Sequence, residues 1–444
     1  MRTWIKGGIL INEGRMFRAD VLIENDRIRA IGERFSPEET AGCRVVSAAG
    51  RYVIPGVIDD QVHFREPGLT HKGDMAEGSR AAAAGGITSF MDMPNVNPPT
   101  TSRRLLEQKQ EIAARNSLVN YSFYLGATSG NLDEIKQADP ATVCGIKVFM
   151  GSSTGNMLVD QLPVLERIFA ESPLLIATHS EDNPTIEANL SRFKERYGED
   201  IPAACHPEIR SREACFKSSS LAVSLARKFG SRLHLLHLST AEETGLLDGP
   251  FRPEKKITGE AVVHHLWFND EAYRTKGHLV KWNPAIKQEA DRVALLKAVN
   301  AGIIDVIGTD HAPHTFEEKS GVYTQAASGG PMVQHSLCVM LELAERGETT
   351  PEIVVERMCH TPAALFRIEE RGFLRPGYKA DICIVEKNPW TVEKENLLYR
   401  CGWSPLEGCR LTYRVHATFV NGRQVYENGA FDEGYRGEML RFRP

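Results

Sequence analysis

From Pro55 onward, short apolar segments alternate with polar segments whose apolar residues recur at helical spacing. Residues 86–93 (GITSFMDM) and 305–310 (DVIGTD) are typical of the apolar segments, and residues 101–116 (TSRRLLEQKQEIAARN) of the helical ones. This alternation is the signature of repeated strand–helix–strand units, which build a parallel sheet. A closed barrel and an open, doubly wound sheet both satisfy it.

The two ends of the chain differ from this middle part and resemble each other. Residues 1–54 contain short β-rich segments separated by Gly, Asn or Asp. The last seventy or so residues return to the same texture, and Asn421-Gly422 between apolar runs is a strong hairpin signal. The pattern predicts a small β domain built from both termini, with an α/β domain inserted between them.

Composition excludes several functional classes. With 53 Lys+Arg against 58 Asp+Glu, the net charge of −5 argues against a nucleic-acid partner, which would need a basic face. No apolar run is long enough for a signal peptide or a membrane span, so we expect no membrane partner. The nine cysteines include no CxxC pair, which predicts reduced thiols and a cytoplasmic location.

Side chains that can bind a metal ion follow the predicted strands. Parallel α/β folds place their sites at the carboxyl ends of strands, and imidazole and carboxylate suit zinc. Alone, each residue has a commoner explanation, since Asp310 could cap a helix and Lys147 could lie along the surface. Together, such residues at successive strand ends predict a metal site. They are His63, Lys147, His179, His237 and Asp310, with His311 and His314 beside the last.

Several motifs resemble those of class I-like dihydroorotases, within the cyclic amidohydrolase superfamily. The most specific are QVHFREPG (61–68), MDMPNVNPP (91–99) and GTDHAPH (308–314). The resemblance extends over nearly the whole chain in the same order. It implies a TIM-like (β/α)8 barrel with a small β-sandwich domain formed by both chain termini. We therefore expect three segments: 1–54 and 366–444 in the sandwich, and 55–365 in the barrel.

The resemblance implies an enzyme that interconverts N-carbamoyl-L-aspartate and L-dihydroorotate plus water, in de novo pyrimidine (UMP) biosynthesis. It implies one or two zinc ions per subunit, with Lys147, after carboxylation by CO2, as the bridging ligand. His179 and His237 would hold one ion, and His63 and Asp310 the other. A metal-activated hydroxide would attack the cyclic amide while Asp310 carries the proton.

The same resemblance implies the residues around the substrate. Arg65, a planar fork suited to carboxylates, would bind the substrate carboxylate together with neighbouring polar groups. Asn283 would contact the pyrimidine ring, and the loop ASGGPM (327–332), which departs from the usual loop sequence, would supply backbone contacts. The full set is His63, Arg65, Asn95, Asn283, His314, Ser328 and Gly329.

One metal-ligand position departs from the family pattern. The opening motif is usually His-x-His, but here its first position is Gln61. An amide oxygen is a weaker, neutral ligand for zinc than an imidazole. We therefore expect the site of Lys147, His179 and His237 to fill first and the second site to be weak.

Three alternatives remain open: a hydantoinase or dihydropyrimidinase, an allantoinase, or a catalytically inactive homologue that serves as a structural partner of aspartate transcarbamoylase. Arg65 and Asn95 argue against the first two, and the number of retained site residues argues against the third. We expect a small-molecule substrate and a homodimer, with association with aspartate transcarbamoylase left open. His264 and His265 match a motif of the family but suggest no role.

Overall fold

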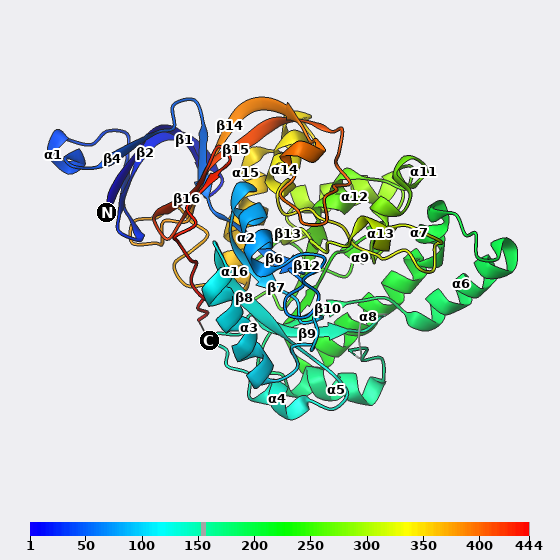
Figure 1. Ribbon diagram of the computed structural model, residues 1–444. Helices are drawn as coiled ribbons and strands as arrows, with labels where there is room; N and C mark the ends of the chain where they lie inside the picture. Colours follow the sequence, from blue (N-terminus) through cyan, green and yellow to red (C-terminus); the bar gives the residue numbers. More distant parts are fainter. Residues whose placement is uncertain (152–156, 444) are drawn as a thin grey trace.

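Eight parallel strands form the centre of the computed structural model, which describes residues 1–151 and 157–443. Strands adjacent in the chain are hydrogen-bonded neighbours throughout, and a bridge between Val62 and His311 joins the last strand region to the first. The expected TIM-like barrel is confirmed (Figure 1). Its strands are β6 (Val57–Val62), β7 (Ile87–Asp92), β8 (Asn120–Gly126), β9 (Gly145–Phe149), β10 (Ile176–His179), β11 (Leu233–Leu235), β12 (Ile257–Val262) and β13 (Val306–Gly308).

The barrel strands are short and buried along their whole length, as expected for parallel strands covered by helices. Polar N-caps start several of the helices between them: Asp74 caps α2 and Ser102 caps α3. The longer helices are α2 (Met75–Ala84), α3 (Arg103–Asn116), α5 (Leu162–Glu171), α6 (Asn183–Tyr197), α8 (Arg212–Phe229), α12 (Glu289–Asn300) and α14 (Ser336–Glu345). The shorter ones are α1 (Pro37–Thr40), α4 (Leu132–Lys136), α7 (His206–Ile209), α9 (Ala241–Thr244), α10 (Val263–Trp267), α11 (Ala272–Lys276), α13 (Phe316–Lys319), α15 (Pro351–Val355) and α16 (Thr361–Leu365), with single turns η1 (Ala203–Cys205), η2 (Gly277–Val280), η3 (Glu356–His360) and η4 (Lys394–Asn396).

Both termini contribute to one second sheet, mostly antiparallel, as the sequence pattern predicts (Figure 1). The N-terminal and C-terminal halves meet where β5 pairs with β14. The predicted hairpin turn joins β15 to β16, and its residues Asn421 and Gly422 have φ of 49° and 75°, as a two-residue hairpin loop requires. The strands are β1 (Arg2–Asn12), β2 (Arg15–Glu24), β3 (Arg27–Gly32), β4 (Arg44–Ser47), β5 (Tyr52–Pro55), β14 (Ile382–Thr391), β15 (Arg410–Val420), β16 (Arg423–Glu427) and β17 (Ala430–Phe431).

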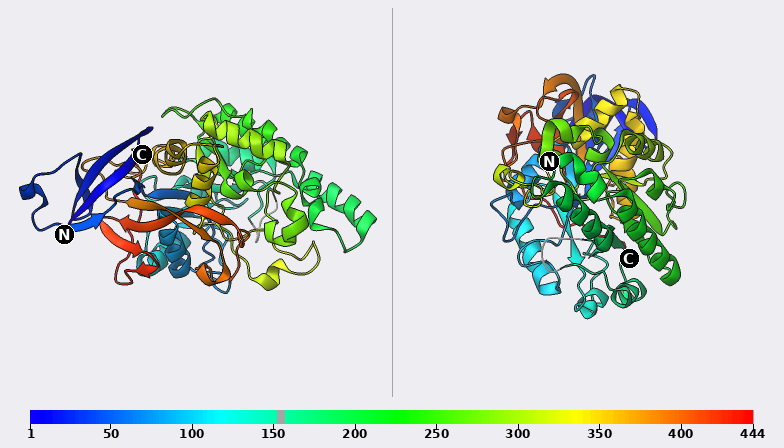
Figure 2. Two further views of the ribbon diagram at one scale, coloured as in Figure 1. Left: turned by 90° about the horizontal axis from the view of Figure 1, so that it is seen from above. Right: turned by 90° about the vertical axis from the view of Figure 1, so that its right-hand side faces the viewer.

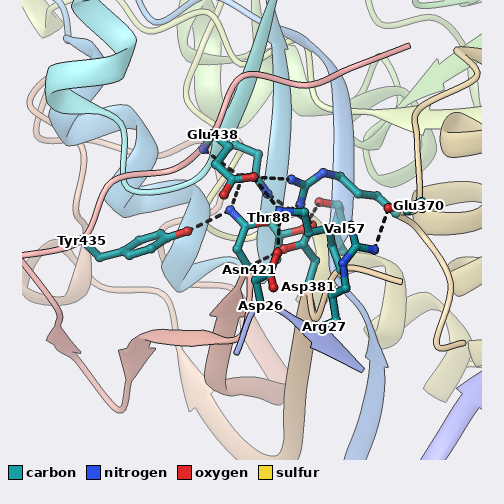
Figure 3. Close-up of polar contacts among 12 residues, drawn as sticks. Asp26, Arg27, Val57, Thr88, Glu370, Asp381, Asn421, Tyr435 and Glu438 are labelled. Atoms are coloured by element: carbon teal, nitrogen blue, oxygen red, sulfur yellow. Dashed lines mark hydrogen bonds and ion pairs between the residues drawn. The ribbon is translucent and has the colours of Figure 1, made fainter. Parts of the chain in front are cut away.

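A buried polar network fastens this sheet to the barrel (Figure 3). The side chain of Asn421 donates to Asn120 Oδ1 on β8 and to the hydroxyl of Tyr435, both at 2.8 Å. Asp381 accepts from the backbone N–H of Asn421 at 2.7 Å and forms an ion pair with the buried Arg371. Because each buried charge has a partner, the junction is held by hydrogen bonds as well as by apolar packing.

The segment between β10 and β11 extends furthest from the terminal sheet. Its helices α6 and α7 lie at the end of the molecule away from the terminal sheet in Figure 1, and this segment projects at the same end when the molecule is seen from above (Figure 2, left). Among the described residues, no helix combines the length and the hydropathy needed to cross a membrane.

Candidate active site

A cavity opens at the carboxyl ends of the barrel strands, and the eleven residues predicted to bind metal or substrate line it. His311, named beside Asp310, does not line it, and its Nδ1 accepts a hydrogen bond from the backbone N–H of Met332 at 3.0 Å. Four further residues, Gln61, Phe149, Trp282 and Ala312, complete the cavity wall. The eleven are His63, Arg65, Asn95, Lys147, His179, His237, Asn283, Asp310, His314, Ser328 and Gly329. The predicted gathering of strand-end side chains therefore occurs, although the role of each is a separate question.

Two histidines face each other on one side of the cavity. Nδ1 of His179, the last residue of β10, lies 3.1 Å from Nε2 of His237, two residues beyond β11. Burial lowers the pKa of both imidazoles, that of His237 well below its usual value, so both are neutral. His237 has a φ of 40°, and its backbone N–H donates to Glu260 Oε2 at 2.7 Å, which holds this unusual conformation.

Lys147 lies beside this pair, in the middle of β9. Its side chain is buried, and no described residue accepts a hydrogen bond from its amine, which sits 4.7 Å from the centre of the Phe149 ring. Burial lowers the pKa of Lys147 to about 7. A buried amine that is partly neutral and unpartnered is able to react with CO2, and the resulting carbamate is an anionic metal ligand.

His63, Asp310 and Gln61 meet on the other side. Asp310 Oδ1 lies 3.2 Å from His63 Nε2 and accepts a hydrogen bond from Gln61 Nε2 at 3.0 Å. The other nitrogen of His63 lies 2.7 Å from Oδ1 of Asn95. If His63 donates to Asn95, its Nε2 and the Asp310 oxygen face each other with lone pairs, and a proton or a cation must lie between them.

The donor set fits a metal ion. At Zn–N distances of 2.0–2.1 Å, two tetrahedral imidazole ligands have nitrogens about 3.4 Å apart, close to the separation in the His179–His237 pair. Within residues 1–151 and 157–443, however, no three His, Cys, Asp or Glu side chains are grouped so as to hold an ion. Lys147 lines the same cavity as His179 and His237.

Arg65 forms the opposite wall. It follows β6, has a φ of 66°, and is only 3% exposed. Its Nε donates to Pro313 O at 3.0 Å, and its Nη2 lies 3.1 Å from His314 Nε2. Burial lowers the pKa of Arg65 to about 10, so it is still a cation at neutral pH. No carboxylate of the described chain forms an ion pair with it.

The rest of the wall includes the loop of Ser328 and Gly329, next to His314. Gly329 has a φ of 127°, and an added Cβ would lie 2.6 Å from Ala312 O, so only glycine fits there. His314 Nε2 lies 3.1 Å from Ser328 O, which ties this loop to the cavity. Burial, together with the nearby Arg65, lowers the pKa of His314 to about 3, so its imidazole is neutral.

Behind the wall lie residues that the sequence reasoning gave no role. The two ring nitrogens of His265 lie 3.2 Å from Leu238 O and from Pro284 O, and the neutral ring donates its one N–H to one of these carbonyls, next to Asn283. His264 stacks on Trp282 with ring centres 4.2 Å apart. Their position in the motif HHL was a usable signal, but it did not indicate what they contact.

Glu181 is fully buried behind His179, with Oε2 at 3.0 Å from His179 Nε2. Burial alone would raise its pKa, but Arg210 and His179 lower the pKa of Glu181 to about 2. Its place in the motif HSED was visible in the sequence. That of Arg210 was not, because only the folded chain brings Arg210 to it.

Comparison with known proteins places these features in context. Residues 52–425 match the amidohydrolase family. A dihydroorotase from Halobacterium salinarum is 32% identical over 433 residues, covering 95% of this chain and 97% of the relative. An allantoinase from Bacillus velezensis is 31% identical over 437 residues, covering 96% and 94%. The solved structure of an L-hydantoinase (dihydropyrimidinase) from Arthrobacter aurescens superimposes with a TM-score of 0.92 at 26% identity, covering 99% of both chains.

Proposed function

Because the chain belongs to the amidohydrolase family, we propose that this cyclic amidohydrolase is a dihydroorotase, which interconverts N-carbamoyl-L-aspartate and L-dihydroorotate. The resemblance drawn from the sequence motifs is confirmed. The substrate needs a separate argument, because relatives of similar identity carry the names dihydroorotase and allantoinase.

The buried guanidinium of Arg65 carries the proposal. A cation removed from water needs a partner, and the described chain offers Arg65 a carbonyl and an imidazole but no carboxylate. Dihydroorotate brings a ring carboxylate, whereas allantoin and dihydrouracil have none. The planar fork of an arginine is suited to bind such a group through two parallel hydrogen bonds. Asn95 and His314, on the same wall, would complete this subsite.

His179, His237 and carboxylated Lys147 would hold a zinc ion. When bound, the ion polarises the amide carbonyl and makes water acidic enough to act as a nucleophile near neutral pH. His63 and Asp310 would form the second, weaker position. The lowered pKa values of His179 and His237 support this assignment, because only a neutral imidazole offers a lone pair to a metal.

Asp310 would move the proton. Its Oδ1 is engaged by Gln61 and His63, so Oδ2 is the atom left to take the proton from the attacking water and give it to the leaving ring nitrogen. In the direction of cyclisation the same oxygen works in reverse. Asn283 and the backbone of Ser328 and Gly329 would hold the ring in place.

A substrate panel tests the proposal. The zinc-supplemented protein is assayed for hydrolysis of L-dihydroorotate, allantoin and dihydrouracil, and for cyclisation of N-carbamoyl-L-aspartate. We expect turnover of dihydroorotate in both directions and a far lower kcat/KM for the two substrates without a carboxylate. A preference for allantoin or dihydrouracil would reject dihydroorotate as the substrate, while the assignment as a cyclic amidohydrolase would stand. Failure of all substrates at every metal loading would favour an inactive structural partner of aspartate transcarbamoylase.

A further inference from the structure

Arg210 and Glu181 form a buried ion pair directly behind the metal-binding histidines. Glu181 stands two residues beyond β10 and is fully buried, and neither residue lines the cavity. Arg210 Nη1 donates to Glu181 Oε2, the same oxygen that lies 3.0 Å from His179 Nε2. The mechanism proposed above uses neither side chain.

The carboxylate acts on the tautomer of His179. It lies off the axis of the ring N–H and accepts no hydrogen bond from it, but at 3.0 Å its negative charge still favours the proton on Nε2. Nδ1 then carries the lone pair and points at His237 Nε2, toward the cavity. In the metal-free protein His237 would donate from Nε2 to His179, which agrees with the lack of any hydrogen-bond partner for His237 Nδ1 among the described residues.

Arg210 holds this carboxylate in place through their ion pair. Its backbone N–H donates to His206 O at 2.9 Å, at the end of α7. His206 is itself fixed, with Nδ1 2.7 Å from the Tyr323 hydroxyl and Nε2 2.6 Å from Trp282 O. The segment that projects away from the terminal sheet in Figure 1 is thus anchored, through α7, at the back of the active site.

We propose that Glu181, held by Arg210, is a positioning residue that fixes His179 as an Nδ1 metal ligand. The charge of the carboxylate favours the proton on the outer nitrogen, so the inner nitrogen is ready to bind without rearrangement. Partners of this kind typically strengthen metal binding 10- to 100-fold. This role rests on the metal site in the proposed function, and the experiment below separates the two.

The test is zinc affinity, measured by competition with a chelator, in Glu181→Gln and wild-type protein. We expect the variant to bind zinc roughly 10- to 100-fold more weakly. Asp381→Asn is the matched control, because it breaks another buried arginine–carboxylate pair, with Arg371, and neither residue lines the cavity. That control should lose stability and keep wild-type zinc affinity.

A second readout does not need the metal. Nitrogen-15 NMR of labelled histidines in the metal-free protein reports the tautomer, with His179→Asn used to assign the signal. We expect His179 to carry its proton on Nε2 in the wild type and to lose this preference in Glu181→Gln. If that variant does not fold because Arg210 is left unpaired, the double variant Glu181→Gln/Arg210→Met removes both charges and gives the same expectations.

The outcomes are distinct. Equal zinc affinity in wild type and variant, with the His179 tautomer unchanged, would overturn the positioning role while leaving the proposed function intact. A wild-type protein that binds no zinc would overturn the metal site itself.

Discussion

The amide nitrogen of Gln61 lies 3.0 Å from Oδ1 of Asp310, the same oxygen that faces His63 Nε2 at 3.2 Å. An amide N–H presents a proton to the carboxylate, whereas an imidazole in its place would present a lone pair to a cation. Gln61 thus supplies Asp310 Oδ1 with one hydrogen bond where the family's histidine would supply a metal ligand. We predict that protein purified without added zinc holds one ion per chain, bound by His179 and His237, as elemental analysis would show.

The complementary variant is Gln61→His, which adds an imidazole ligand to the weaker position. It should raise the tightly held zinc from one ion to two per chain. Two tightly held ions in the wild type would contradict the prediction.

Replacing the proposed proton carrier should remove most of the activity. Asp310→Asn keeps the size and the hydrogen-bonding capacity of the side chain but cannot exchange a proton at neutral pH. General acid–base catalysis contributes about 10²- to 10⁴-fold, so we expect kcat for dihydroorotate hydrolysis to fall by that factor. Zinc content must be measured in parallel. Undiminished activity in a zinc-loaded variant would reject the assignment of Asp310.

Lys147 should be carboxylated in a pH-dependent way. Only the neutral amine reacts with CO2, and burial lowers the pKa of Lys147 to about 7. The reactive fraction therefore rises with pH, from roughly a tenth at pH 6 to about nine tenths at pH 8. At the same concentration of dissolved CO2, metal-free protein incubated with zinc should regain activity faster at pH 8 than at pH 6.

Lys147→Arg supplies the control, because its guanidinium stays charged and forms no carbamate. It should bind less zinc at both pH values, with no effect of bicarbonate. Equal recovery of the wild type with and without bicarbonate would argue against carboxylation.

The gathering of the site residues was predictable because strand ends in a parallel sheet meet at one edge. His63, Lys147, His179, His237 and Asp310 each follow or belong to an apolar run, so the strand pattern alone places them together. Closure of the sheet was not predictable from that pattern, since it depends on the pairing of Val62 with His311, which are distant in sequence. The resemblance to a family supplied that part.

The roles of residues behind the cavity wall could not be predicted from the sequence, for a physical reason. Arg210 belongs to no strand end, and it reaches Glu181 only because the segment after β10 folds back through α7. Local periodicity carries no information on such contacts. The backbone conformation of His237 is a further example: β11 ends at Leu235, and His237, with a φ of 40°, lies outside the β region.

The carboxylate subsite should respond to Arg65. Arg65→Met removes the guanidinium but keeps much of the apolar stem. A hydrogen bond to a charged group contributes about 1.5–3 kcal/mol, so kcat/KM for dihydroorotate should fall roughly 10- to 150-fold. Most of the change should lie in KM, because substrate and transition state carry the same carboxylate. Unchanged steady-state kinetics would remove Arg65 from the subsite.

A buried ion pair beneath the site should couple stability to substrate binding. Lys109 Nζ lies 2.6 Å from Asp92 Oδ2 and donates to Met93 O at 2.7 Å, and both charged side chains are buried. Asp92 Oδ1 also accepts from the backbone N–H of Phe64 at 2.8 Å, so the pair holds the segment that leads to Arg65. Lys109→Met would leave an uncompensated carboxylate, which costs about 3–5 kcal/mol in the free energy of unfolding.

Urea denaturation measures that loss, and the KM for dihydroorotate should rise with it as the Arg65 segment loosens. Lys136→Met is the matched control, because Lys136 pairs with Glu171 at 2.9 Å on the surface. An exposed pair contributes little to stability because water screens it, and this one lies outside the cavity wall. Equal losses of stability in the two variants would show that the buried Lys109–Asp92 pair stabilises the fold no more than the surface pair does. An unchanged KM in Lys109→Met would show that the pair does not position the Arg65 subsite.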